Sequence, residues 1–222
     1  MQNCWLRKQG RASCIIFFAG WGMDPTPFRD IDVRDHDLFM VFDYSRMERG
    51  DFQDFPTGSY EDLHLVAWSM GVWAAAYALA GQEKRFTTAT AVNGTLSPID
   101  ATRGIEPGAF TDMVNNFSAP ALHAFYKSMF TDQAEAERFF RNRPQRSEHN
   151  ILHELVCLGR YYDQRKPVNN IFGRKIVGSR DRIFPARNQL RSWGRDKCSL
   201  IRAPHFPFYG LPSWDFIIAQ DS

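Results

Sequence analysis

A serine at the junction of two sequence patterns is the residue in this chain best placed to act as a nucleophile. The run "LHLVAW", residues 63–68, is typical of a strand buried on both faces, and the small-residue-rich run after Ser69 is typical of a helix. Ala67 and Gly71 flank Ser69 at a spacing of two residues, close to the G-x-S-x-G pattern of a strained strand–serine–helix turn, with one extra methyl group at Ala67. The other interpretation is that Ser69 only caps the helix that follows.

An acid and a base follow the serine in the chain order Ser–Asp–His that such a turn requires. Asp181 comes just after the run "KIVGS", and His205 stands in the Pro-rich loop after the run "KCSLIRA". A carboxylate beside an imidazole can hold one tautomer and stabilise the charged ring while the imidazole takes the serine proton. Each residue also has an ordinary interpretation, because an aspartate after a strand often forms a turn and a loop histidine is often incidental. Asp196, in the turn "GRDK", is a weaker candidate for the acid.

Two backbone N–H groups could stabilise the oxyanion that forms when a serine attacks a carbonyl. Met70 directly follows Ser69 and supplies the first. The loop "FFAGWGMD", residues 17–24, follows an early apolar run, and its glycines permit a tight turn that brings the N–H of Trp21 near the serine. The alternative is a simple Gly-rich turn. A phosphate-binding loop is disfavoured, because neither G-x-G-x-x-G nor a Walker lysine is present.

Short apolar runs that alternate with helical patterns must position these residues. Such runs predict strands buried in a mostly parallel sheet, and their alternation predicts a doubly wound α/β fold. Residues 97–167 interrupt the alternation, since their apolar residues recur at helical spacing and Ser147 could cap one of the helices. We therefore expect one domain over residues 1–222, with a helical lid insertion at about 97–167. The predicted strands are residues 14–20, 38–43, 63–68, 87–94, 174–179 and 197–203.

Composition argues against several classes of function. The 222 residues include 27 basic and 25 acidic residues, and the net charge of +2 gives no overall field for nucleic acid. The amino-terminal residues lack the apolar stretch of a signal peptide, and no run reaches the roughly 18 apolar residues of a membrane span. The four cysteines are scattered without a CxxC pair, which disfavours a zinc site and suits a reducing compartment. We expect a cytoplasmic protein with no nucleic-acid or membrane partner and no metal.

Four short motifs resemble those of a known family. "FFAGWGMD", "AWSMGVWAA", "GSRDRIFP" and "PHFPF" together are similar to motifs of the compact pimeloyl-acyl-carrier-protein methyl ester esterases of bacterial biotin synthesis, in the α/β-hydrolase superfamily. The resemblance implies an α/β-hydrolase fold and a serine esterase without cofactors, which frees the terminal carboxylate of a pimeloyl methyl ester held on acyl carrier protein. The implied roles are Ser69 as nucleophile, His205 as general base and acid, Asp181 as its orienting partner, and Trp21 and Met70 as oxyanion donors.

The insertion carries the residues that we expect to bind the substrate and its carrier. An acidic carrier protein needs a basic landing site, and the stretch "ERFFRNRPQR" places four arginines within nine residues. The ordinary interpretations are a solvated helix face that ends at Pro144 and a set of simple core phenylalanines. The predicted carrier contacts are Arg138, Arg141, Arg143 and Arg146. The predicted lining of an apolar acyl tunnel is Phe110, Phe117, Phe125 and Phe139.

Two other functions remain open from the residues alone. The first is an acyl thioesterase or a general short-chain carboxylesterase acting on small-molecule esters, because the same three side chains would carry that chemistry. The second is a non-catalytic α/β-hydrolase-like protein that binds a ligand or a protein, because a fold does not by itself fix a function. Comparing hydrolysis of the methyl ester with hydrolysis of the carrier thioester distinguishes the first alternative from the methyl ester esterase. Labelling by a serine-reactive fluorophosphonate distinguishes the second, because a binding protein should stay unlabelled at Ser69.

Overall fold

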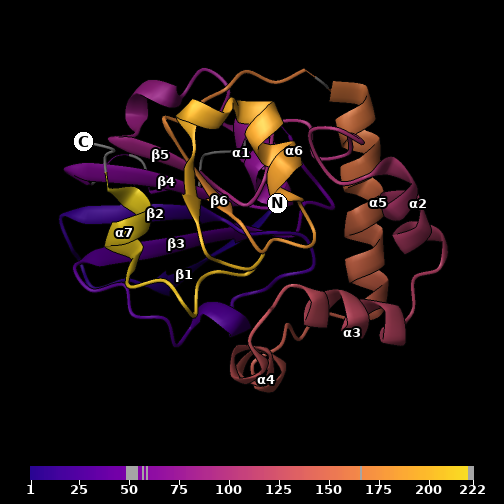
Figure 1. The fold of residues 1–222 in the computed structure, drawn as a ribbon. Helices are drawn as coiled ribbons and strands as arrows, with labels where there is room; N and C mark the ends of the chain where they lie inside the picture. Colours follow the sequence, from indigo (N-terminus) through magenta and orange to yellow (C-terminus); the bar gives the residue numbers. More distant parts are fainter. Residues whose placement is uncertain (49–54, 57, 59, 166, 220–222) are drawn as a thin grey trace.

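A seven-stranded, mostly parallel sheet forms the centre of the protein (Figure 1). A computed structural model describes residues 1–48, 55–56, 58, 60–165 and 167–219. Within these ranges the strand order is β1-β3-β2-β4-β5-β6-β7, and only β1 runs antiparallel to its neighbour. The strands are β1 (Gln2–Arg7), β2 (Ser13–Phe18), β3 (His36–Phe42), β4 (Asp62–Trp68), β5 (Thr88–Val92), β6 (Arg174–Gly178) and β7 (Ser199–Ile201).

All six strands predicted from apolar runs are confirmed, with ends shifted by at most two residues. The central strands β2, β3 and β4 are almost wholly buried, which explains why their sequences read as continuous apolar runs rather than as alternations. The strand β1 was not predicted. It forms the edge of the sheet beside β3 and is half exposed, so its sequence QNCWLR carries polar residues where a central strand would carry apolar ones.

Three helices outside the insertion pack against the sheet. All nine residues of α1 (Met70–Ala78) are buried, and this helix contacts β2 and β4, with Gly71 lying close to the end of β2. The helix α6 (Ala186–Trp193) packs against β6, and α7 (Trp214–Ile218) packs against β4 and β5. Neither α6 nor α7 was predicted, because both are short. Single turns of 3-10 helix cover Thr26–Phe28, Glu83–Arg85 and Arg195–Lys197.

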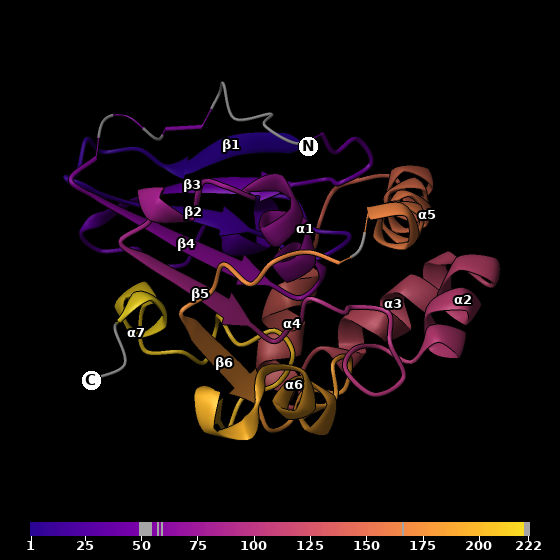
Figure 2. The same cartoon turned by 90° about the horizontal axis from the view of Figure 1, so that it is seen from above.

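A helical insertion lies between β5 and β6 in the chain. Its helices α2, α3 and α5 stand beside one end of the sheet in both views (Figures 1 and 2), and α4 lies below the others in Figure 1. Side chains cap the starts of these helices by accepting backbone N–H bonds, and Ser147 accepts the N–H of Asn150 at 3.3 Å as its position predicts. The helices are α2 (Pro107–Asn115), α3 (Ala119–Ser128), α4 (Gln133–Arg141) and α5 (Glu148–Arg165).

None of the helices in the described residues combines the length and the apolar character needed to cross a bilayer. All four cysteines have free thiols. Burial raises the pKa of the Cys14 thiol to about 12, so this buried side chain is an inert part of the core.

Candidate active site

Ser69 occupies a strained corner between β4 and α1. Its backbone has φ 59° and ψ −130°, a conformation that side-chain-bearing residues rarely adopt. Gly71 explains the need for small neighbours, because a Cβ atom there would lie 2.4 Å from the Ala19 carbonyl oxygen and 2.5 Å from that of Phe18. The Ser69 side chain makes no capping hydrogen bond to α1. The structure therefore disfavours the interpretation of Ser69 as a simple helix cap.

The structure brings Ser69, His205 and Asp181 together from three distant parts of the chain. The Nε2 atom of His205 lies 3.0 Å from Ser69 Oγ, and its Nδ1 atom lies 2.9 Å from Asp181 Oδ2. All three residues are buried, with 4% of Ser69, 1% of His205 and 7% of Asp181 exposed. They follow β4, β7 and β6, whose carboxyl ends meet at one edge of the sheet. This is the geometry in which an imidazole can take the serine proton.

Asp181 accepts hydrogen bonds on both of its carboxylate oxygens. Its Oδ1 atom accepts the backbone N–H groups of Ile183 at 2.8 Å and Phe184 at 2.9 Å, so the predicted turn role is also present. Its Oδ2 atom accepts from Gln189 Nε2 at 3.0 Å as well as from His205. Four donors thus fix the carboxylate in one orientation. The other acid candidate, Asp196, lies in an exposed 3-10 turn.

His205 is held by neighbours that sequence reasoning missed. The indole N–H of Trp68 donates to the His205 carbonyl oxygen at 2.8 Å, and the Asn93 amide donates to the same oxygen at 3.0 Å. The ring of Phe184 lies parallel to the imidazole, with centroids 5.9 Å apart and an interplanar angle of 4°. Asn93 has a positive φ of 46° directly after β5. An asparagine before a glycine at the end of a buried strand is the one sequence signal that could have pointed to this support.

A cavity of about 440 Å³ opens at Ser69. Trp21 and Met70 both line it, in agreement with their predicted position beside the serine. Met70 is the first residue of α1, where the N–H groups have no partner within the helix. Their donation to an oxyanion stays a prediction. The rest of the lining is Ile105, Ala109, Phe110, Met113, Ala121, Ala124, Phe125, Ser128, Leu155, Arg182 and Ile183.

Two of the four predicted lining phenylalanines reach this cavity, namely Phe110 and Phe125. Phe117 packs edge-on against the Trp21 ring at 6.4 Å and is absent from the lining. Phe139 was placed wrongly. It is fully buried and packs on the ring of Phe206 at 5.5 Å, so it belongs to the core between α4 and the loop that carries His205.

The predicted carrier contacts divide into exposed and buried arginines. Arg141 and Arg143 are exposed at the end of α4 and just beyond it. Arg138 is half-buried, with its guanidinium 4.0 Å from the centre of the Tyr209 ring. Arg146 does not belong to an exposed basic surface, and that part of the prediction is wrong. Its side chain is 9% exposed and is committed to buried ion pairs, which a sequence cannot reveal.

No cluster of three or more His, Cys, Asp or Glu side chains that could hold a metal ion is present in the described part of the chain.

Comparison with known proteins places the chain in a family. The model of the family described as "Pimeloyl-ACP methyl esterase BioG" matches residues 1–217. The chain belongs to the BioG family. A family member from Haemophilus influenzae has a crystal structure that matches with a TM-score of 0.86 and 30% identity, covering 98% of this chain and 100% of that chain.

Two relatives by sequence add context to the family assignment. An uncharacterized protein of Haemophilus influenzae is 34% identical over 204 residues, which are 90% of this chain and 91% of the relative. A malonyl-[acyl-carrier protein] O-methyltransferase of Bacteroides fragilis is 37% identical over 183 residues, which are 82% of this chain. The match spans only 37% of that methyltransferase.

More distant structures establish the fold alone. A putative non-heme bromoperoxidase of Mycobacterium tuberculosis matches with a TM-score of 0.60 and 13% identity, over 95% of this chain and 90% of that one. Together with the BioG structure it confirms the predicted α/β-hydrolase fold with a mostly parallel sheet. The chain is thus a member of the BioG family with an α/β-hydrolase fold.

Proposed function

We propose that the chain is a serine carboxylesterase that hydrolyses the methyl ester of pimeloyl-acyl carrier protein in the synthesis of the biotin precursor. The observation that carries the proposal is the contact of Ser69 Oγ with His205 Nε2 at 3.0 Å, on a strained corner that opens into a cavity. The family description supplies the methyl ester and the carrier as the expected substrate. Because such a substrate is made and used inside the cell, we expect the protein to act in the cytoplasm.

The acylation step follows from the hydrogen bonds at the site. Asp181 accepts the Nδ1–H of His205, so the Nε2 atom of the neutral ring accepts the Ser69 hydroxyl proton as Ser69 Oγ attacks the ester carbonyl. The negative charge on the carbonyl oxygen is held by the N–H groups of Trp21 and Met70. One such donor is worth about 3–4 kcal/mol in the transition state. His205 then gives its proton to the departing methanol.

The deacylation step uses the same groups in reverse. A water molecule gives its proton to His205 Nε2 and attacks the acyl-serine carbonyl, and the proton passes to Ser69 Oγ as the ester bond breaks. The products are methanol and the free ω-carboxylate, still joined to its carrier by the thioester. The substrate, one water molecule and these side chains supply every atom that the two steps need.

The cavity would bind the acyl chain of the substrate, and the exposed arginines would bind the carrier protein. A volume of about 440 Å³ lined by Phe110, Phe125 and other apolar side chains suits an alkyl chain. Arg141 and Arg143 have exposed side chains with which an acidic carrier protein could form ion pairs. We propose that Arg138, which lies on α4 itself, also contacts the carrier protein while its guanidinium stays over the Tyr209 ring.

A substrate panel tests the proposed reaction. Pimeloyl methyl ester on acyl carrier protein is incubated with the enzyme, and the mass of the carrier is measured. Cleavage of the methyl ester leaves the acyl chain on the carrier, whereas cleavage of the thioester releases the chain and leaves the bare prosthetic arm. We expect the first product. Release of the acyl chain would favour a thioesterase, and no product with any ester would favour a binding protein.

Charge reversal tests the carrier contact separately from the chemistry. We expect Arg141→Glu with Arg143→Glu to lower kcat/KM about tenfold on the carrier-bound ester and to leave hydrolysis of dimethyl pimelate unchanged. In the matched control, Arg7 and Arg11 are replaced by glutamate. Both arginines are exposed near the amino ends of the parallel strands, at the end of the sheet opposite Ser69. Equal losses in both double variants, or equal losses on both substrates, would contradict docking at α4.

A further inference from the structure

The helical insertion holds the loop of residues 19–24, which carries the proposed oxyanion donor Trp21. The indole of Trp21 is buried, and the Gly22 N–H, the Gly22 carbonyl and the Met23 carbonyl are each bonded to a side chain of the insertion. The bonds are Trp21 Nε1 to the Ile151 oxygen at 2.8 Å, Gly22 N to Glu154 Oε2 at 3.2 Å, Tyr126 Oη to the Gly22 oxygen at 3.0 Å, and Arg146 Nη1 to the Met23 oxygen at 3.3 Å.

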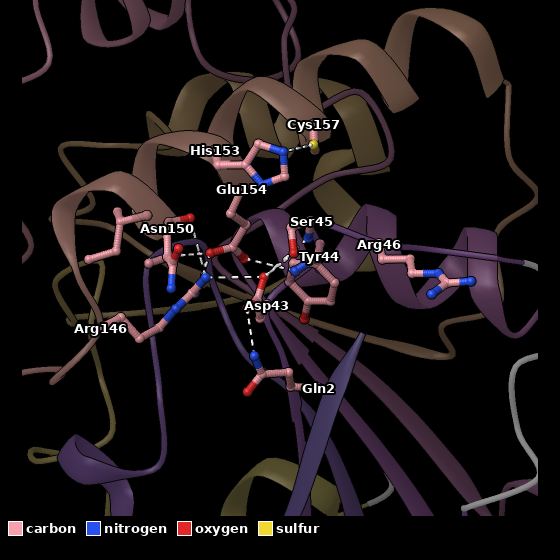
Figure 3. A network of polar contacts seen from close by, with 12 residues as sticks. Gln2, Asp43, Tyr44, Ser45, Arg46, Arg146, Asn150, His153, Glu154 and Cys157 are labelled. Carbon is pink, nitrogen blue, oxygen red and sulfur yellow. Dashed lines mark hydrogen bonds and ion pairs between the residues drawn. The ribbon is translucent and has the colours of Figure 1, made fainter.

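Glu154 is a fully buried carboxylate at the centre of these contacts. Its Oε1 atom accepts the backbone N–H of Tyr44 at 3.1 Å, and its Oε2 atom accepts from Gly22 N and from Arg146 Nη1, the latter at 2.5 Å. Figure 3 shows the side chain extending from α5 into the space between Arg146 and the turn after β3. Burial raises the pKa of Glu154, and the charge of Arg146 opposes that effect.

The network around Glu154 continues into the sheet. Arg146 Nη2 lies 3.1 Å from Asp43 Oδ1, and both side chains are less than a tenth exposed. Asp43 Oδ2 in turn accepts from Gln2 Nε2 at 2.9 Å (Figure 3). One arginine between two acids thus joins the insertion to β1 and to the end of β3. The Glu154 side chain is therefore held in one position, because Arg146 is fixed by Asp43 and Asp43 is fixed by Gln2.

We propose that Glu154 is a positioning residue for oxyanion stabilisation, which fixes the turn at Gly22 so that the Trp21 N–H faces the reacting carbonyl. The N–H of Gly22 belongs to the peptide plane directly after Trp21, so holding that plane limits rotation of the Trp21 backbone. The inference rests on the proposed function and adds a second role to the insertion. The insertion both covers the cavity and sets the geometry of the oxyanion donor.

The change Glu154→Gln isolates this role because it keeps the size of the side chain. All three partners of Glu154 are donors, and a glutamine has one acceptor oxygen and one NH₂ group. The NH₂ group must therefore face either Tyr44 N or the pair formed by Gly22 N and Arg146 Nη1. In both orientations the negative charge that pairs with Arg146 is lost, and Arg146 also donates to the Met23 oxygen, so the loop is held less firmly. A loop that is no longer fixed loses stabilisation in the transition state more than it loses binding of the ground state.

The test compares kinetics and amide exchange in the intact protein. With p-nitrophenyl butyrate, we expect Glu154→Gln to lower kcat by about 10- to 100-fold, a partial loss of one oxyanion donor, with KM changed by less than about threefold. Hydrogen exchange followed by mass spectrometry should show faster exchange in the peptide that contains Gly22. The thermal midpoint of unfolding is measured on the same samples.

Asp37→Asn is the matched control. Asp37 is also a fully buried carboxylate that accepts two backbone N–H groups, from Gln9 at 2.6 Å and Gly10 at 3.1 Å, and one side-chain donor, Tyr60 Oη at 2.9 Å. It lies near the amino end of β3, away from the Ser69 edge. We expect a lowered thermal midpoint with kcat within twofold of the wild type.

The outcomes separate the positioning role from general destabilisation and from failure of the esterase proposal. A wild-type kcat in Glu154→Gln, or equal losses of kcat in Glu154→Gln and Asp37→Asn, would overturn the positioning role. If the wild type hydrolyses no ester, the proposed function fails, and the exchange experiment still decides whether Glu154 holds the loop. Unchanged exchange at Gly22 would then overturn the inference.

Discussion

Two Ser–His–Asp contacts lie at opposite edges of the same sheet. We refer to Ser69, His205 and Asp181 as the carboxyl-edge set, and to Ser13, His36 and Asp215 as the amino-edge set. In the amino-edge set Ser13 Oγ lies 2.8 Å from His36 Nδ1, and His36 Nε2 lies 2.9 Å from Asp215 Oδ1. These distances match those of the carboxyl-edge set to within a few tenths of an ångström. Hydrogen-bond distances alone therefore do not distinguish the two.

The backbone distinguishes them. Ser13 is the first residue of a regular strand, where it pairs in register with His36 and Asp62 of the neighbouring parallel strands. Ser69 instead has a positive φ, which among the described non-glycine residues is shared only by Arg34, Asp43 and Asn93. Strain of this kind costs on the order of 1–3 kcal/mol and persists only where the surrounding structure enforces it. The backbone conformation of Ser69 therefore lowers the stability of the fold, and it presents Ser69 Oγ at the corner.

Burial and surroundings differ as well. The Asp181 side chain is fully buried, whereas the Asp215 side chain is 48% exposed. Ser69 borders a cavity next to the start of α1, where helix N–H groups favour negative charge. The amino-edge set joins β2 and β3 to α7 and contributes to stability. The carboxyl-edge set thus differs from the amino-edge set by backbone strain at its serine, by the cavity beside it and by the N–H donors at the start of α1. These three features, and not the three side chains alone, mark the candidate site.

The largest expected effect comes from removing the carboxyl-edge hydroxyl. We expect Ser69→Ala to lower kcat for ester hydrolysis by about 10⁴- to 10⁶-fold, because no other group takes over the covalent step. The protein should unfold at the same temperature or higher, since the strained serine contributes no capping bond. Initial rates and a thermal melt measure both. More than a tenth of wild-type activity in this variant would break the comparison.

The next effect comes from the acid of the carboxyl-edge set. In Asp181→Asn the amide oxygen serves the backbone N–H groups of Ile183 and Phe184, because these can only donate, so the NH₂ group faces His205 Nδ1 and the Gln189 amide. His205 then carries its proton on Nε2, the wrong tautomer for accepting the proton of Ser69. We expect kcat to fall by about 10³- to 10⁴-fold. A steady-state assay at several pH values, with recovery of less than tenfold at any pH, checks the prediction.

Removing the hydroxyl of the amino-edge serine should affect stability and not catalysis. We expect Ser13→Ala to leave kcat and KM within twofold of the wild type. Stability should fall by about 1 kcal/mol, because the change removes one hydrogen bond to His36. Urea unfolding measures the loss. A drop in kcat comparable to that of Ser69→Ala would contradict the assignment of the two sets.

The smallest effect concerns the acid of the amino-edge set. The hydrogen bond from His36 holds the pKa of Asp215 below its ordinary value, so the folded chain favours the ionised carboxylate. This contribution is present above the ordinary carboxyl pKa and is lost as the pH falls through the lowered pKa. Asp215→Asn should therefore be less stable than the wild type at neutral pH, by less than about 1 kcal/mol for so exposed a pair. Urea midpoints that still differed at the lowest pH would contradict this sign.

The parts of the fold that could be predicted are those with continuous local patterns. β2 to β6 are mostly buried, and their apolar runs predict them. β7 was also predicted from its run although it is only partly buried, whereas the half-exposed edge strand β1 has no such run. The strained corner was predictable because its small neighbours are a steric requirement, as the contacts of a Cβ at Gly71 make clear. Chain order, together with their positions just after predicted strands, indicated Asp181 and His205 as partners for it.

The parts that could not be predicted depend on contacts between distant residues. Arg146 looks like its exposed neighbours Arg141 and Arg143 in the sequence, yet it is buried between two acids from different elements. Phe139 and Phe125 are equally apolar, but one lies in the core and the other lines the cavity. Nothing local separates the members of these pairs. For the Asn93 contact behind His205, the asparagine–glycine pair at the end of β5 is the one local signal.

Covalent labelling of the serines tests whether Ser69 is a nucleophile and Ser13 is not. The wild-type protein is treated with a fluorophosphonate, digested and mapped by mass spectrometry, with Ser69→Ala as the control. We expect an adduct on the peptide containing Ser69 and none on the peptide containing Ser13, although both serines contact a histidine. Labelling of Ser13 to the same extent, or an unlabelled Ser69 in protein that is folded by thermal melt, would contradict this expectation.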